Sequence, residues 1–94
     1  PDTSAEDLAW VGPRRVPLAL KAFQDRLRLS GAVEKLPRSY IYCARSRPGD
    51  VFRQFRARAH QEGWQCFDLD ASHSPNVSAP DALAEILEVI AATR

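Results

Sequence analysis

The sequence lacks any long hydrophobic run, and no stretch of its 94 residues approaches the roughly 18 apolar residues that a membrane span requires. It also lacks an excess of charge of one sign, because thirteen basic and twelve acidic residues leave a formal charge of +1. We therefore expect neither a membrane nor nucleic acid as a partner.

Methionine is absent and no signal peptide is recognisable, so we expect that an upstream segment has been removed.

Cysteine is scarce as well. Cys43 and Cys66 are the two cysteines, and both fall in hydrophobic, strand-like runs. Disulfide scaffolds of this length usually carry four or more cysteines in their loops. We therefore expect two buried thiols in a reducing compartment, and a cytoplasmic location.

The first 36 residues carry weak structural signals. Thr3 or Ser4 can cap a short helix that reaches about Val11, and Pro13 and Pro17 then interrupt the chain. Apolar residues follow at irregular spacing, so they need packing partners that the segment itself does not supply. We interpret residues 1–36 as an appendage to the rest of the chain.

Residues 37–94 give sharper signals, in the order strand, helix, strand, helix. We expect strands over 39–44 and 64–69, because these short β-prone runs are bounded by proline, glycine and polar loops. Helical spacing predicts a helix over 51–62, and a last helix begins at Pro80 with a stripe of Leu83, Ile86, Leu87 and Ile90. Two strands joined by a helix predict an α/β fold with a parallel sheet. Such sheets normally have five or more strands, so we expect these two to form one edge of a larger sheet.

A histidine follows the second predicted strand. His73 lies four residues beyond Leu69, in the polar loop 70–79, at the sheet edge where the catalytic groups of open α/β folds gather. Histidine titrates near neutral pH, so it can take a proton from a serine hydroxyl and return it to a leaving group. The alternative is a loop histidine with no chemistry, at the turn into Ser74 and Pro75.

Several short motifs of the chain belong together: Leu36 to Cys43, Phe52, Phe55, Gly63-Trp64, Leu69-Asp70, His73, Ala79-Pro80, Leu83-Ala84 and Leu87. Together they resemble the C-terminal third of an α/β-hydrolase, in the branch of esterases and hydroxynitrile lyases, over about residues 20 to 92. The resemblance implies that residues 1–36 are the end of a cap-like helical region and that residues 37–94 are the C-terminal strand-helix-strand-helix part of the hydrolase core. It also implies that His73 is the base of a catalytic triad that needs no cofactor.

The sequence departs from the family pattern at the triad acid. The family places an aspartate two or three residues after the first of these strands, where this chain has Arg45, Ser46 and Arg47. Asp50 is the nearest carboxylate, and it reaches His73 if the loop from Arg45 folds back. Two roles stay open for Asp50: triad acid, or N-cap of the helix expected from Val51.

A smaller departure from the family pattern is Ser72 before the histidine, where the family usually has glycine.

The nucleophile of a serine hydrolase is also missing from the chain. It sits on a G-x-S-x-G turn, and the four glycines are nowhere paired at that spacing. We therefore expect this chain to supply the triad histidine to a serine esterase that acts on small carboxylic esters. Its partner is then the N-terminal part of the same hydrolase, and cyanohydrin cleavage is a variant within the same branch. The alternative is a non-catalytic α/β scaffold or protein-binding module.

Two other groups of residues are expected to carry no chemistry. Asp68, Asp70 and His73 lack a further histidine or cysteine pair that would complete a metal site. The basic cluster of the central segment has interspersed acidic residues and no aromatic platform for single-stranded nucleic acid, so we expect a solvated helix face. Its members are Arg45, Arg47, Arg53, Arg56 and Arg58.

Overall fold

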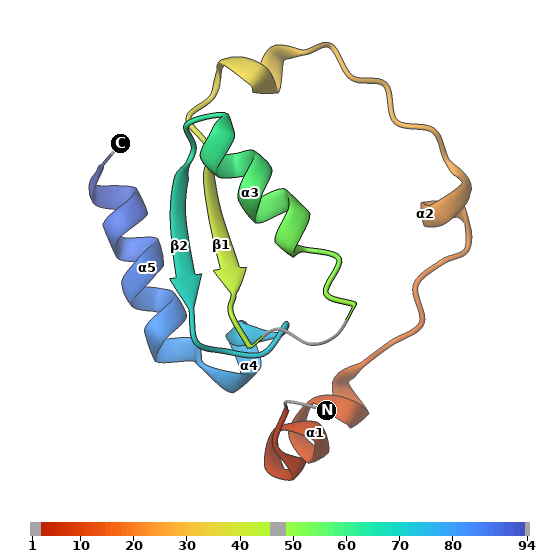
Figure 1. The fold of residues 1–94 in the computed structure, drawn as a ribbon. Coiled ribbons are helices and arrows are strands. Elements are labelled where there is room, and N and C mark those ends of the chain that lie inside the picture. The colour runs from red at the N-terminus through yellow and green to blue at the C-terminus, as the bar shows by residue number, and fades with distance from the viewer. Residues whose placement is uncertain (1–2, 46–48, 94) are drawn as a thin grey trace.

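A computed structural model describes residues 3–45 and 49–93 of the chain (Figure 1). Its elements follow the predicted order, strand, helix, strand and helix, after a largely irregular N-terminal third. They are α1 (Ala5–Val11), a 3-10 turn η1 (Gly12–Arg14), α2 (Lys21–Gln24), a second 3-10 turn η2 (Ala32–Lys35), β1 (Ser39–Cys43), α3 (Arg53–Gln61), β2 (Gln65–Leu69), α4 (Pro75–Ser78) and α5 (Pro80–Ala92).

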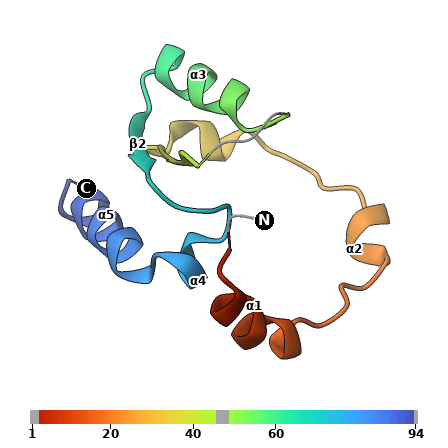
Figure 2. The ribbon, with the colours of Figure 1, turned by 60° about the horizontal axis from the view of Figure 1, so that its bottom comes forward.

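The two strands form a parallel sheet with a helix on each face. Ser39 pairs with Gln65 and Cys43 with Leu69, which fixes the register along both strands. Helix α3 connects the strands and covers one face, and α5 packs on the opposite side against β2 (Figure 2). This is a small α/β arrangement. Within the described residues each strand has a single neighbour, so its other edge is unpaired.

The alternation of side chains along the strands separates the two cysteines. The partner of Cys66 is Tyr40 and the partner of Cys43 is Leu69, so the thiols lie on opposite faces, three positions and about 10 Å apart along the strands. A disulfide needs Cα atoms within about 7 Å, so Cys43 and Cys66 are not bridged to each other. Both are partly buried, so the prediction of buried thiols holds only in part: the layers that cover this two-stranded sheet are thin.

The core is small and lies between the sheet and its helices. Its buried apolar members are Tyr42, Ala59, Leu69 and Ala71. The whole chain exposes 7835 Å², whereas a compact monomer of 10.5 kDa exposes about 5,400 Å². Its radius of gyration is 15.9 Å, against about 12 Å for a compact domain of this length. A large part of the chain is therefore unpacked.

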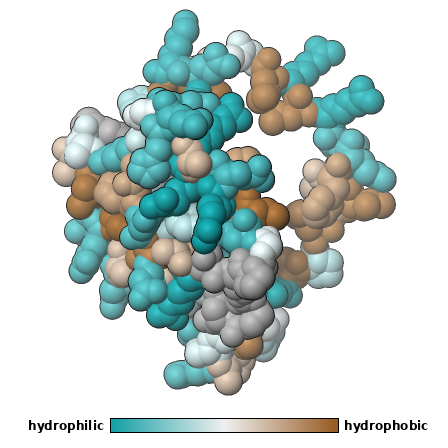
Figure 3. Space-filling view, in the orientation of Figure 1, coloured by the Kyte–Doolittle hydropathy of each residue, from teal (hydrophilic) through white to brown (hydrophobic). Residues whose placement is uncertain are grey.

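That unpacked part is residues 15–36, here called the arm. It leaves the end of η1 and runs around one side of the molecule before it enters β1 (Figures 1 and 2). Figure 3 shows its hydrophobic side chains gathered away from the rest of the protein, with a gap between them and the sheet. Its large apolar side chains are all more than half exposed: Val16, Leu18, Leu20, Phe23, Leu27, Leu29, Val33 and Leu36.

The helix before the arm was predicted from its cap and is confirmed. Ser4 precedes α1, and its Oγ accepts a hydrogen bond from the backbone N–H of Asp7 at 3.1 Å. This bond satisfies one of the free N–H groups at the helix start. Helix α1 packs against α4, so this helix lies at the loop side of the sheet.

Two features differ from the sequence-based expectation by more than one residue. A short helix, α4, occupies Pro75–Ser78 inside the segment 70–79 that was predicted as a loop. Pro75 stands at its first position, where the fixed φ of proline suits a helix and its missing N–H has no cost. Helix α3 begins at Arg53 rather than Val51, because Val51 and Phe52 form a turn with Asp50 before the helix starts.

No helix in the described part of the chain is long and apolar enough to cross a membrane.

The packing of α3 on the sheet can be tested at one alanine. Ala59 is 2% exposed, and its carbonyl accepts a hydrogen bond from the backbone N–H of Trp64 at 2.9 Å. We expect Ala59→Leu to destabilise the protein by about 1–3 kcal/mol, since the extra volume forces α3 away from the strands. Ala57→Leu adds the same volume at an exposed position of the same helix. Urea unfolding of both variants measures the two losses of stability. Equal unfolding midpoints for Ala59→Leu and Ala57→Leu would contradict the close packing of α3 on the sheet at Ala59.

Candidate functional site

His73 lies at the carboxyl edge of the sheet, in the loop between β2 and α4. Its side chain is exposed. The imidazole stacks on the ring of Phe52, with ring centroids 4.6 Å apart and an angle of 18° between the planes. Phe52 comes from the turn that leads into α3, so a contact between the two crossover loops holds the histidine ring at this edge.

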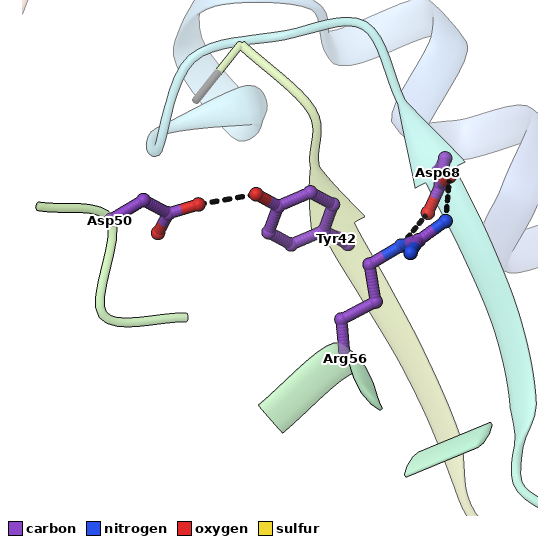
Figure 4. Close-up of polar contacts among 4 residues, drawn as sticks. All are labelled: Tyr42, Asp50, Arg56 and Asp68. Carbon is purple, nitrogen blue, oxygen red and sulfur yellow. Dashed lines mark hydrogen bonds and ion pairs between the residues drawn. The ribbon is translucent and has the colours of Figure 1, made fainter. Parts of the chain in front are cut away.

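Asp50 follows β1 and also lies at the carboxyl edge. Its Oδ2 accepts a hydrogen bond from the hydroxyl of Tyr42, which is buried between the sheet and α3 (Figure 4). Its Oδ1 accepts the backbone N–H of Phe52 at 2.9 Å. Both carboxylate oxygens are thus engaged by the protein's own donors.

These bonds favour the ionised form of Asp50. The hydrogen bond from Tyr42 lowers the pKa of the Asp50 carboxyl most, and the N–H of Phe52 lowers it further. The positive charges of Arg53 and His73 act in the same direction. The influence of His73 is the smallest of these effects on the Asp50 carboxyl.

The structure brings His73 and Asp50 to one edge without a direct hydrogen bond between them among the described residues. Phe52 links them, because its N–H binds the carboxylate while its ring stacks on the imidazole. The N-cap position of α3 is occupied by Phe52, so Asp50 closes the turn before the helix and is not the cap itself. Residues 46–48, on which the expected fold-back of the loop depends, lie outside the described residues.

Three serines hold the loop that carries His73, and sequence reasoning missed this. Ser72 is 1% exposed, and its Oγ lies 2.7 Å from the Oγ of Ser78 in α4. The Ser78 hydroxyl donates to the carbonyl of Ser74 at 3.2 Å, and the N–H of Ser74 reaches the Ser72 Oγ at 3.4 Å. Serine at position 72, where the resembling family has glycine, therefore belongs to a closed ring of hydrogen bonds beside the histidine.

The two aspartates that precede the histidine in the sequence, Asp68 and Asp70, each pair with an arginine. The guanidinium of Arg56 binds both oxygens of Asp68, with its Nε 2.7 Å from Oδ1 (Figure 4). This lowers the pKa of the Asp68 carboxyl. Arg45 pairs with Asp70 at 3.0 Å. No group of three histidine, cysteine, aspartate or glutamate side chains in the described residues is arranged to hold a metal ion.

The basic cluster of the central segment is largely ion-paired. Besides Arg45 and Arg56, Arg58 binds Glu62 at 2.7 Å, one helical turn further along α3. Arg47 lies outside the described residues. Exposed pairs of this kind add little stability, and they leave a helix face of mixed charge.

Comparison of the chain with protein-family models, with curated proteins and with solved structures found no match in any of the three.

The bond between Tyr42 and Asp50 gives a test of the site's electrostatics. A lowered pKa means that this carboxylate stabilises the fold above its unfolded pKa of about 3.9, and that the stabilisation is lost as the pH falls through the folded value. We expect Tyr42→Phe to raise the pKa of Asp50 toward the ordinary value, and thus to reduce this loss in acid. An NMR titration of the Asp50 carboxyl carbon measures the shift.

The matched control is Tyr40→Phe. The Tyr40 hydroxyl faces the carbonyl of Phe52 at 3.4 Å and is not bonded to Asp50. We expect this variant to leave the Asp50 titration close to that of the wild type. The same Asp50 pKa in all three proteins would contradict the assigned hydrogen bond.

Proposed function

We propose that residues 37–94 are the C-terminal strand-helix-strand-helix part of an α/β-hydrolase of the esterase branch, and that His73 is the base of its catalytic triad. The observation that carries the proposal is the placement of His73. It follows the second of two parallel strands at their carboxyl edge, with its ring stacked on Phe52 and the Asp50 carboxylate nearby. In open α/β folds this edge is where catalytic groups gather.

The reaction needs a nucleophilic serine on a G-x-S-x-G turn, and this chain has no such sequence. In the assembled enzyme, a serine on a G-x-S-x-G turn attacks the ester carbonyl while His73 takes the hydroxyl proton. The protonated His73 then gives that proton to the leaving alcohol. Water repeats the cycle on the acyl-enzyme, with His73 again as base, and the acid is released. No cofactor enters this chemistry.

Asp50 is the carboxylate that we propose to stabilise the charged imidazole. It already carries a negative charge favoured by two hydrogen bonds, and its field reaches His73. A direct bond to the imidazole N–H requires one carboxylate oxygen to leave the Tyr42 hydroxyl or the Phe52 N–H. The exposed position of His73 leaves room for such a rearrangement when another part of the enzyme closes over the loops.

The unpaired strand edges support a partner that completes the sheet. A parallel sheet of two strands is rarely stable by itself, and an unpaired edge offers backbone donors and acceptors to a further strand. We assign this place to the N-terminal part of the same hydrolase, on the same or a separate polypeptide. The lack of a disulfide between Cys43 and Cys66 is compatible with the reducing, cytoplasmic location that we propose.

A fluorophosphonate probe tests the proposal, because it labels the activated serine of a serine hydrolase. We expect the protein as isolated with its partners to be labelled on a serine within a G-x-S-x-G sequence, and His73→Ala to suppress the labelling. Peptide mapping identifies the labelled residue. Absence of any His73-dependent labelling would overturn the proposal.

The second candidate is a non-catalytic protein-binding module. It is favoured by one specific observation, the exposed apolar arm beside an incomplete sheet. Under this alternative the chain binds a partner protein, and no serine reacts with the probe in any assembly that contains it.

A further inference from the structure

The arm is both apolar and basic. Its eight large apolar side chains are more than half exposed, and Val16 and Leu27 reach 83%. Arg15, Lys21, Arg26, Arg28 and Lys35 stand against Asp25 and Glu34, so five basic and two acidic residues give the arm a net charge of +3.

Basic and apolar residues alternate in one stretch of the arm. Residues 26–29 have the order Arg, Leu, Arg, Leu and belong to no helix or strand. A fitting surface therefore offers exposed apolar side chains next to acidic ones.

The outer face of α5 has this composition. The helix contains Asp81, Glu85 and Glu88 and no basic residue, a net charge of −3. At 100° per residue the three acidic residues form one exposed stripe. Val89 lies beside this stripe and is 49% exposed. The charge of this face is equal and opposite to that of the arm.

The arm does not meet the α5 of its own chain. Both views of the ribbon place α2, in the middle of the arm, and α5 at opposite ends of the molecule (Figures 1 and 2). The complementary surface that the arm fits is therefore presented by another molecule. Two copies that exchange arms satisfy both surfaces at once, and this arrangement closes about a twofold axis.

The exposed area is sufficient for such a dimer. Each chain exposes 7835 Å², about 2,400 Å² more than a compact monomer of its mass. A stable interface needs about 800 Å² per partner. We infer that the protein forms a homodimer in which the arm of each copy docks on the acidic face of α5 in the other. This inference does not depend on the proposed hydrolase function.

The mass of the purified chain in solution tests the inference. We expect light scattering to give about 21 kDa, twice the 10.5 kDa of one chain, and high salt to weaken the dimer because salt screens exposed charges. The double reversals Arg26→Glu/Arg28→Glu in the arm and Glu85→Lys/Glu88→Lys in α5 should each raise the dissociation constant at least about 100-fold, since like charges then face each other.

Mixing the two reversed variants separates lost docking from lost folding. Each reversed surface finds its complement in the other variant, so the mixture should regain a dimer while each variant alone stays monomeric. Arg53→Glu/Arg58→Glu makes the same change of charge on α3, on the other face of the sheet, and should leave the dimer intact. A monomeric wild type, or a dimer that survives both reversals, would overturn the inference.

Discussion

His73→Ala is expected to lower the ester turnover of the assembled enzyme by about 10⁴-fold or more, the size of loss seen when a triad base is removed. Alanine cannot accept the serine proton, so the nucleophile stays a weakly reactive hydroxyl. The loss should fall on kcat, because the imidazole acts in the transition state and contributes little to binding of the ester. Hydrolysis of a p-nitrophenyl ester measures it.

The control for this substitution is His60→Ala. His60 is the only other histidine of the chain, and it is exposed on α3, where we assign it no role. The control should keep full turnover and the same thermal stability as the wild type. An unchanged turnover in His73→Ala would remove His73 from the triad, whatever the control shows.

Leu69→Ala is expected to destabilise the fold by about 2–5 kcal/mol, the usual cost of a cavity at a buried leucine. Leu69 is the last residue of β2 and is 6% exposed. Its carbonyl accepts hydrogen bonds from Ala44 and Ala71, so it stands where both strand ends and the His73 loop converge. A domain of this length has a total stability of roughly 5–14 kcal/mol, so the loss is a large fraction of it.

Leu8→Ala removes the same atoms from an exposed site on α1. Leu8 is 51% exposed, and its replacement should cost less than about 1 kcal/mol. Chemical unfolding of the two variants under identical conditions gives the difference. Similar losses in both would mean that the sheet end around Leu69 is not the packed centre of the protein.

The elements of residues 37–94 were predictable because their signals are local. The β-prone runs before Ala44 and before Asp70, and the helical spacing after each, are read within a few residues of sequence. The Ser4 cap is local as well, since donor and acceptor lie three residues apart. The helix α4 escaped prediction because four residues are too few for a periodic pattern, and Pro75 was taken as part of a loop.

The contacts of the candidate site were not predictable in the same way. The bond from Tyr42 to Asp50 spans a loop, and the pairing of Arg56 with Asp68 depends on how α3 lies over the sheet. The stacking of Phe52 on His73 joins two crossover loops that only the parallel register brings together. Sequence reasoning could place His73 and Asp50 at one edge, but it could not find the groups that hold them there.

The central claim is that this chain supplies its histidine to a hydrolase whose nucleophile lies elsewhere. The most direct test is the intact mass of the protein as isolated, under native and denaturing conditions, with peptide mapping of every heavier species. The account predicts a longer polypeptide or an associated one that carries a serine in a G-x-S-x-G sequence. Isolation from its source of a folded species in which mapping finds no polypeptide with such a serine would contradict the claim, whether this chain is present in one copy or two, because His73 would then have no nucleophile to serve.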